Sequence, residues 1–525
     1  MAQQNDTLYG VYDNTVDWNT LGNHTHIQSL SGSINRMMTV TRPASGAVDN
    51  GMVVVLNDNG TVSIPDRTPD TVSDPISGGS YEGIDYNTVY DPDSQSIIMA
   101  YQQNLTSSRT LKIVTLTPSS TGDSIIFGVP NTLKSTYDIN YNMISLDYDT
   151  TNNKIVLVWG EPYTVLTEGQ YMVVGEVISD VNPANKSISF GAPVYIGDDP
   201  GTNASSSVAY DSANNISVIT RSDDTDIKSM PVTVSGMSLI SGVEENIGSA
   251  SREIKSLYHP TSGKIVLCYM PSDYYFYSMV GTVTATGAAS AASISWGTPD
   301  LISLDELTID TGTKMAYDSI NDRFIACWMV NNYINVSAGE VIGDSITWSE
   351  KTSIYIGVTS GYQRLSISFD STKRNFVITY RNPDGYIGLV VGSYNIRTGK
   401  AHIWDNTIIS SEITRPQPIH TSYYPPTGEH IITYDIDTDN LYHRLINIVL
   451  STNIVTDNFL GISQGSAGNG EDCVIGRYGF IAENLSVLVP NTHYYSDAVG
   501  NIVTYDTQGP YIGYAITESK FLIKG

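Results

Sequence analysis

The sequence predicts an all-β protein: a seven-bladed β-propeller inserted into a small β domain, plus a short N-terminal segment. The first observation behind this prediction is residue usage. The 525 residues include 35 Tyr, 44 Gly and 22 Pro, while only 15% of residues are charged, and such a composition favours strands and turns over helices. The second observation is a repeat of roughly 56 residues that occurs seven times along the chain.

The charge balance excludes two classes of partner. Lys and Arg number 27 against 54 Asp and Glu, so the formal net charge is −27. Contacts with nucleic-acid phosphates need clustered Lys and Arg, and an anionic membrane surface repels an acidic protein. Apolar runs such as 52–56 and 155–159 are strand-sized, far short of the ~20 residues that span a bilayer. We therefore expect neither nucleic-acid binding nor membrane insertion.

The N-terminus and the cysteines indicate the compartment. The first residues, MAQQNDTLYG, lack the basic and apolar regions of a secretory signal, so synthesis in a cytoplasm is expected. Cys268, Cys327 and Cys473 cannot form a disulfide framework and have no metal-binding spacing. We expect Cys268 and Cys327 to be small buried hydrophobic residues.

Four segments follow one another along the chain. Residues 1–40 match no pattern that we can name. Residues 41–68 are expected to form the first part of the small β domain, because an Asn-Gly turn at 59–60 lies between strand-like runs. Residues 69–455 hold the repeats, and residues 456–525 are expected to complete the small β domain.

Each repeat begins with an aromatic residue followed in most copies by Asp, then a polar turn and an alternating strand. The seven copies begin at Tyr90-Asp91, Tyr148-Asp149, Tyr210-Asp211, Tyr258-His259, Tyr317-Asp318, Phe369-Asp370 and Tyr424-Pro425. An Asp at this position accepts hydrogen bonds from the backbone two residues on. We therefore interpret these aspartates as turn residues and not as catalytic or calcium-binding groups.

The second half of each repeat supplies two more strands. The pair 174–177 (VGEV) and 187–193 (SISFGAP) returns as 280–283 (VGTV) and 293–299 (SISWGTP). Four strands per repeat is the make-up of a propeller blade, and a closed ring removes most exposed sheet edges. Four-stranded meanders in an open sandwich are the alternative.

The segments that flank the repeats carry a resemblance. They are 44–63, which begins ASG and contains the Asn-Gly turn; 459–463 (FLGIS); 488–495 (LVPNTHYY); and 511–525 (YIGYAITESKFLIKG). These segments resemble a small β domain at the ends of tail-fibre and other virion appendage proteins of bacteriophages, especially marine ones. The Tyr-Asp repeats likewise resemble propellers carried by such proteins. Here the two halves of the small domain are separated by nearly 400 residues, which is why we predict an insertion.

The resemblance implies a structural virion protein, located in a tail fibre or appendage, that contacts other virion proteins and binds a host-surface receptor, a glycan or a protein. One alternative is a purely architectural fibre, collar or decoration protein. Another is a glycan-degrading depolymerase or sialidase-like enzyme. No GxSxG, P-loop or HExxH motif is present, and neither is a sialidase-like Asp-box, so we predict no enzymatic activity.

A tyrosine cluster is the candidate ligand site. Tyr274, Tyr275 and Tyr277 follow a predicted strand in one of the repeats. Aromatic faces stack on sugar rings, and tyrosine offers a large contact area at a low entropy cost. The alternative is cross-strand packing, which accounts for most tyrosines in sheets.

In a virion protein, residues 1–40 are expected to be an N-terminal attachment and oligomerisation segment, and this segment holds a candidate metal site. The resemblance implies a homotrimer, and His24 and His26 share one face if the chain is extended there. Three chains would then offer six imidazole nitrogens around an axis, which suits iron or another transition metal. The alternative is two exposed histidines in a loop.

Overall fold

The structure is a computed structural model of the chain. It describes residues 39–44, 48, 53–56, 62–63, 71–72, 76–77, 83–105, 108–119, 124–136, 143–161, 169–197, 205–223, 225–249, 251–271, 273–304, 313–330, 332–357, 365–372, 375–382, 384–395, 400–409, 419–435, 441–447, 459–468, 470–483, 485, 488–496, 502–503 and 511–523. The chain divides into two compact units, one of residues 1–66 and 451–525 and the other of residues 67–450. Candidate metal ligands His24 and His26 lie outside the described residues.

The larger unit consists of antiparallel sheets that follow one another along the chain. The first is β6 (Gly83–Asp91), β7 (Ser96–Leu105), β8 (Ser108–Pro118), β9 (Ile125–Phe127) and β10 (Asn131–Thr136). The second is β11 (Ser145–Asp149), β12 (Lys154–Glu161), β13 (Gly169–Ile178), β14 (Ser187–Phe190) and β15 (Val194–Gly197). The third is β16 (Ser206–Asp211), β17 (Ile216–Ser222), β18 (Asp226–Ser235), β19 (Ser238–Ser241) and β20 (Glu245–Ser249).

Four further sheets complete this unit among the described residues. The fourth is β21 (Ser251–His259), β22 (Lys264–Pro271), β23 (Phe276–Thr284), β24 (Ser293–Trp296) and β25 (Asp300–Ser303). The fifth is β26 (Thr313–Asp318), β27 (Arg323–Val330), β28 (Tyr333–Ile342), β29 (Ser345–Trp348) and β30 (Thr352–Tyr355). The sixth is β31 (Leu365–Asp370), β32 (Asn375–Arg381), β33 (Ile387–Asn395) and β34 (Lys400–Ile408). The seventh is β35 (His420–Tyr424), β36 (Glu429–Asp435) and β37 (Leu441–Asn447), joined by β4 (Thr71–Val72) and β5 (Ile76–Ser77).

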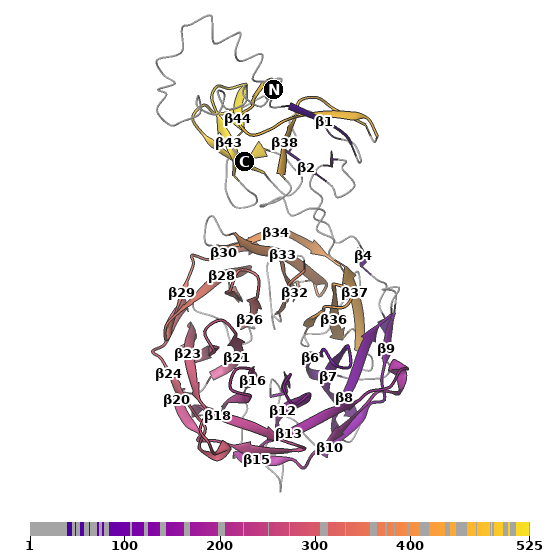
Figure 1. Cartoon of the computed structure of the whole chain (residues 1–525), viewed down its shortest axis with the longest axis vertical. Coiled ribbons are helices and arrows are strands. Elements are labelled where there is room, and N and C mark those ends of the chain that lie inside the picture. The colour runs from indigo at the N-terminus through magenta and orange to yellow at the C-terminus, as the bar shows by residue number, and fades with distance from the viewer. Residues whose placement is uncertain are drawn as a thin grey trace, which may run out of the picture. The chain divides into compact units, whose positions relative to one another are not determined.

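The sheets stand in a ring, and Figure 1 shows the labelled first strands β6, β16, β21 and β26 toward its centre. The helices of the described part are the short 3₁₀ turns η3 (Pro183–Asn185) and η4 (Ala289–Ala291). In six of these sheets two short strands pair with the third strand in place of one long fourth strand, and in the seventh sheet those two strands are β4 and β5. Proline contributes to this break because it has no N–H to donate, as at Pro193 between β14 and β15. The architecture is an all-β, β-propeller-like fold.

The ring closes between its last and first sheets. Tyr86 on β6 donates its hydroxyl to the carbonyl of Thr433 on β36 over 3.1 Å. The outer strand β37 pairs with β4, where Ile446 faces Val72. It also pairs with β5, where His443 faces Ile76. The N-terminal side of the ring therefore completes its last sheet.

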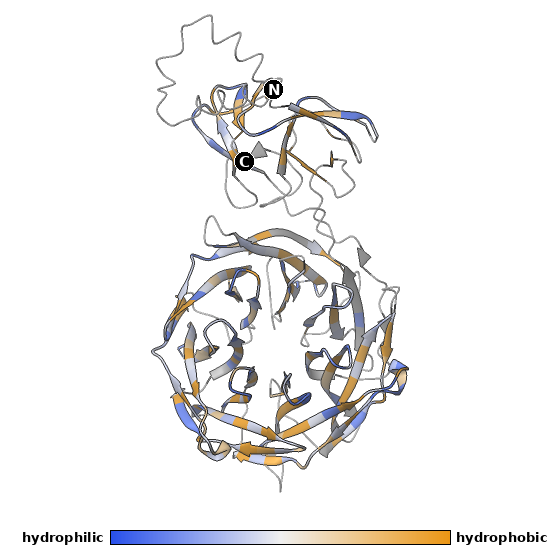
Figure 2. Cartoon of the chain, viewed as in Figure 1, coloured by the Kyte–Doolittle hydropathy of each residue, from blue (hydrophilic) through white to orange (hydrophobic). Residues whose placement is uncertain are grey.

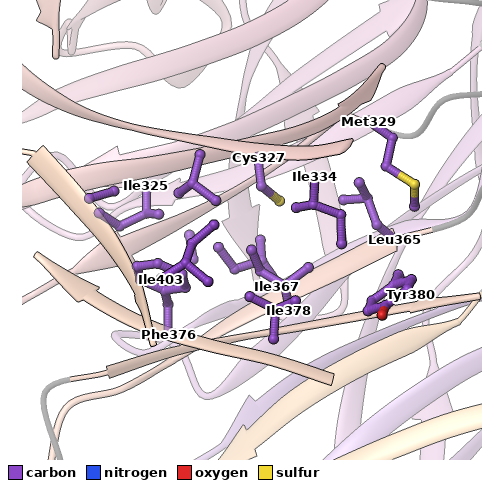
Figure 3. Packing of buried hydrophobic residues seen from close by; sticks show 14 of the residues in the cluster. Ile325, Cys327, Met329, Ile334, Leu365, Ile367, Phe376, Ile378, Tyr380 and Ile403 are labelled. Atoms are coloured by element: carbon purple, nitrogen blue, oxygen red, sulfur yellow. The ribbon is translucent and has the colours of Figure 1, made fainter. Parts of the chain in front are cut away.

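The hydrophobic core lies between neighbouring sheets. In Figure 3, Cys327 and Ile334 of the fifth sheet pack toward Ile367 and Ile378 of the sixth. Hydrophobic residues occur along the strands all round the ring (Figure 2). Since each sheet is covered on both faces by its neighbours, the second strands are buried almost throughout, and β12 is an example. The predicted burial of Cys268 and Cys327 is confirmed.

The recurring aspartates hold the turn between the first two strands of a sheet. Asp211 accepts hydrogen bonds from the backbone N–H groups of Ala213 (3.0 Å) and Asn214 (3.1 Å). Its second oxygen accepts from the side-chain amide of Asn214 over 2.7 Å. Asn215, the last turn residue, has a φ of 55°, and Asn tolerates this left-handed conformation. The interpretation of these aspartates as turn residues is confirmed.

The seventh repeat was aligned one residue too late. Tyr424 pairs with Glu429 at the start of the hairpin, just as Asp149 pairs with Lys154 in the second sheet. Tyr424 therefore stands at the aspartate position and Tyr423 at the aromatic one. Two adjacent tyrosines hide this register in the sequence.

The smaller unit contains two sheets. One has the order β1 (Thr39–Pro43), β39 (Asp472–Gly476), β38 (Phe459–Ser463), β2 (Val53–Leu56) and β3 (Val62–Ser63). The other has the order β40 (Ile481–Glu483), β44 (Lys520–Ile523), β43 (Tyr511–Ala515), β41 (His493–Ser496) and β42 (Ile502–Val503). Strands from before and after the ring thus share a sheet, and Val53, Ile462 and Phe521 share one buried cluster.

Candidate functional site

The predicted tyrosine cluster lies at the turn between β22 and β23. Asp273 organises this turn: it accepts a hydrogen bond from the backbone N–H of Tyr275 (3.1 Å) and another from the hydroxyl of Tyr277 (3.0 Å). Tyr274 has a φ of 63°, a strained conformation for a bulky residue. The ring of Tyr277 stacks on Tyr269, with centroids 5.9 Å apart.

The three predicted residues therefore differ in their roles. Tyr277 packs across strands, as the alternative interpretation expects, and hydrogen bonding to Asp273 adds to burial in raising its pKa. Tyr274 and Tyr275 precede the strand, and both are partly exposed. A role in sugar binding stays a prediction for all three residues.

The neighbouring sheet carries a matching aromatic pair that the sequence analysis missed. In the hairpin registers, Tyr269 faces Tyr277 and Trp328 faces Asn335. Counting two residues back from Tyr277 and from Asn335 gives Tyr275 and Tyr333 at equivalent positions. Tyr333 contacts Tyr355 edge-on at 5.3 Å, and both rings are exposed, at 42% and 54%. We call Tyr275, Tyr333 and Tyr355 the tyrosine edge.

A cavity of about 370 Å³ occupies the centre of the ring. The first strands of all seven sheets described above line it. One level of the cavity is polar. In each sheet it is formed by the residue four positions before the aspartate position of the repeat, which is His259 in the fourth sheet and Tyr424 in the seventh. These seven residues are Asn87, Ser145, Ser207, Lys255, Lys314, Ser366 and His420. We call them the polar ring.

Most members of the polar ring bond to an adjacent sheet. Ser145 accepts from the backbone N–H of Val208 (3.0 Å), and Ser207 accepts from that of Ser256 (2.8 Å). The three remaining contacts of this kind join Ser366 to the N–H of Thr421, Asn87 to the carbonyl of Ile144, and His420 to the hydroxyl of Thr88. These contacts fix the first strands to one another and so hold the cavity open.

The charged groups that line the cavity, together with Asp147, which interacts with Lys255 but is not part of the lining, come from three sheets. Lys314 forms an ion pair with Glu253, 3.2 Å between Nζ and Oε2. Asp147 accepts hydrogen bonds from the backbone N–H groups of Tyr148 and Tyr210, each 2.8 Å. Burial raises the pKa of Asp147, and these bonds oppose the rise.

The two remaining titratable members of the polar ring have lowered pKa values. Burial lowers the pKa of Lys255; Asp147 opposes this effect and Lys314 adds to it. Burial, assisted by the charges of Lys255 and Lys314, lowers the pKa of His420 to about 3. His420 is therefore neutral near pH 7.

Sequence analysis did not identify Lys255 and Lys314. Part of the signal was present: aligning the copies on the aspartate position and counting four positions back gives six members of the polar ring, whereas His420 follows only from the corrected register of the seventh repeat. Within the described ranges, no three His, Cys, Asp or Glu side chains are grouped so that they could share a metal ion. Among the same residues, no helix has the length and apolar character needed to cross a membrane.

The sheets define the class of this protein, an all-β protein with a β-propeller-like ring. No family model matches the chain, and no curated protein matches it. Solved structures similar to it include Sqt1 from Chaetomium thermophilum, with 12% identity, a TM-score of 0.40 and coverage of 70% of this chain and 82% of that one. A protein from Lactobacillus plantarum has 11% identity, a TM-score of 0.44 and coverage of 71% and 96%. The NanB sialidase from Streptococcus pneumoniae has 10% identity, a TM-score of 0.40 and coverage of 72% and 70%. Likenesses this distant bring no function to this chain.

Proposed function

We propose that the chain is a structural component of a bacteriophage virion, a tail fibre or appendage, that binds a host-surface glycan. The terminal segments that resemble virion appendage proteins support this proposal. They lie on both sides of the ring in sequence, yet Val54 of β2 faces Gly461 of β38 in one sheet. Two of the segments that carry the resemblance therefore pair with each other within one compact unit, as the parts of a single domain should.

In this proposal the ring is a seven-bladed propeller, each of its sheets being one blade, and it is inserted into the small β domain. The propeller is the part that meets the host. Loops on a rigid scaffold carry binding residues disproportionately often, and the turns at Tyr275 and Tyr333 connect the second and third strands of adjacent sheets. The tyrosine edge is therefore presented by two neighbouring blades from the same side of the ring.

The tyrosine edge is the observation on which the glycan proposal depends. Exposed aromatic rings on an acidic protein suit neutral sugars better than polyanions. Single protein–sugar contacts are weak, so several copies on one particle would act together. A homotrimer of the chain fits this requirement, and a mass measurement tests it: a monomer at micromolar concentration contradicts the trimer.

The test replaces Tyr275 and Tyr333 by Ala, singly and together, and measures adsorption of particles to host cells. We expect the double variant to adsorb at least about ten-fold more weakly, because removing an anchoring aromatic residue typically costs 1 kcal/mol or more. Tyr478→Ala is the matched control, since Tyr478 is 70% exposed in the smaller unit. Unchanged adsorption by the double variant contradicts the assigned site.

A second experiment separates the alternatives. Incubation with host capsule or lipopolysaccharide gives binding without saccharide release for an adhesin, and release for a depolymerase. Neither binding nor release favours an architectural protein. Immunogold labelling of intact particles tests the virion location directly. If neither the tail nor an appendage is labelled, the proposed location is wrong.

A further inference from the structure

The cavity at the centre of the ring is distinct from the tyrosine edge, and one of its amino groups, that of Lys255, has no hydrogen-bond or ion-pair partner in the part of the chain that the structure describes. Each of the other six members of the polar ring forms a hydrogen bond or ion pair with a neighbouring sheet. Lys255 stands at the same position on β21, but its ammonium group makes no such bond to the residues described. It interacts with Asp147 and Lys314 only as nearby charges.

Two carboxylates are near Lys255, Glu253 in the cavity lining and Asp147 outside it, and both are already satisfied. Asp147 accepts two backbone N–H groups, and Glu253 pairs with Lys314. A cation entering the cavity would therefore compete with bonds already made, and it would meet the like charge of Lys255. An anion gains the charge-assisted hydrogen bond that Lys255 lacks, and such bonds are among the strongest available to a ligand.

We propose that the cavity is a second ligand site, in which Lys255, supported by Lys314, binds the carboxylate of an acidic sugar. This inference rests on the proposed glycan binding and adds a second class of sugar, an acidic one, to the neutral sugars proposed for the tyrosine edge. Ser145, Ser207 and Ser366 accept backbone N–H groups through their oxygens, and each hydroxyl hydrogen remains able to donate to a ligand. The cavity volume of about 370 Å³ is at the small end of the range for ligand sites, which suits one sugar ring.

The aromatic side of the cavity fits the same ligand. Tyr90, Tyr317 and Phe369, which directly precede the turn residues, line it together with the polar ring. A sugar acid has a carboxylate and hydroxyls for the polar level and an apolar C–H face for the aromatic level. A small inorganic anion uses the lysines alone.

The test is a calorimetric titration of the full-length chain at constant ionic strength with sodium D-glucuronate, D-glucose and inorganic phosphate. We expect D-glucuronate to bind, and D-glucose and phosphate to bind at least about ten-fold more weakly, since a hydrogen bond to a charged group is worth roughly that factor. Lys255→Met should lower glucuronate affinity at least about ten-fold, and Lys255→Arg should restore most of it. Lys400→Met is the matched control, because Lys400 pairs with the exposed Glu350 on the outside of the ring.

Three outcomes overturn the proposal: no glucuronate binding, glucose binding as tight as glucuronate binding, or full affinity in Lys255→Met. Phosphate binding equal to glucuronate binding also overturns it, because the site would then be a general anion site. Host-cell binding by the wild-type chain is measured in parallel. If it persists while glucuronate fails to bind, the second site is wrong and the proposed function stands. If it is absent while glucuronate binds, the proposed function is wrong and the second site stands.

Discussion

Glycine residues after the fourth strand set the distance between neighbouring sheets. A Cβ atom added to Gly191 would lie 1.9 Å from the carbonyl oxygen of Met237, which belongs to the hairpin of the next sheet. A Cβ atom added to Gly297 would likewise lie 2.2 Å from the carbonyl oxygen of Asp344. The contacted atoms are backbone and cannot rotate away, so the glycine of the repeated SISFG and SISWG sequences is a spacing residue.

Replacing Gly191 by Ala therefore forces two sheets apart. We expect the free energy of unfolding to fall by roughly 1–3 kcal/mol, the usual cost of overpacking. Gly287→Ala is the control, because a Cβ at Gly287 meets nothing within 4 Å. Urea denaturation of the two variants checks this, and equal stabilities would contradict the spacing role.

His443 makes the stability of the ring depend on pH. Its side chain is fully buried on β37, with Nδ1 3.0 Å from Thr433 Oγ1 and its ring beside Phe127. Burial lowers its pKa to about 3. Between an unfolded pKa of about 6.5 and the folded value, only the unfolded chain takes up this proton, so stability is full above pH 6.5 and declines on acidification.

We expect His443 to contribute up to about 1.4 kcal/mol of lost stability for each pH unit in this window. The measurement is the free energy of unfolding at several pH values between 7 and 4 for the wild type and His443→Leu. The variant should show the shallower slope even if it is less stable throughout. Parallel slopes would mean that the histidine does not titrate in this way.

At the scale of single elements, the turn after each first strand depends on one carboxylate. Asp211→Ala removes three hydrogen bonds within its turn, and we expect a loss of roughly 1–3 kcal/mol. Asp211→Asn keeps an acceptor oxygen and should lose less. Glycan binding should be unchanged in both variants, as measured by adsorption. A variant that keeps its stability but loses adsorption would contradict the turn interpretation.

The sequence predicts these local elements well and the cavity poorly. The Asp211 turn lies within one hairpin, so its residue types and spacing define it. Lys255 and Lys314 are isolated lysines in the sequence, 59 residues apart, and only the curvature of the ring brings their strands to one centre. The tyrosine edge is only partly predictable from the sequence. Tyr275 is recognised because it belongs to a cluster of tyrosines, whereas Tyr333 is matched to Tyr275 only through the strand registers.

For the whole molecule, closure of the ring depends on β4 and β5. These strands have two residues each, too short to stand out in the sequence, and no local pattern links them to β37. Without them the outer edge of β37 would expose unpaired backbone groups. The sequence predicts a ring from its repeats, but the strand that closes it is visible only in the structure.

We expect a chain of residues 67–450 to fold alone, since these residues form one compact unit. A chain of residues 80–450 lacks both closing strands and should lose roughly 2–5 kcal/mol, as several hydrogen bonds of about 1 kcal/mol each are missing. Thermal unfolding and light scattering of the two chains check this. Equal midpoints and no added aggregation in the shorter chain would contradict closure by β4 and β5.

The pairing of Val72 with Ile446 also determines when, during synthesis of the chain, the ring can close. The two residues are separated by about 374 positions, which ribosomes cover at roughly 5–20 residues per second. Val72 therefore leaves the ribosome roughly 20–75 seconds before its partner exists. During that interval the nascent chain can stack its sheets one after another, but the last joint waits until the chain is nearly finished.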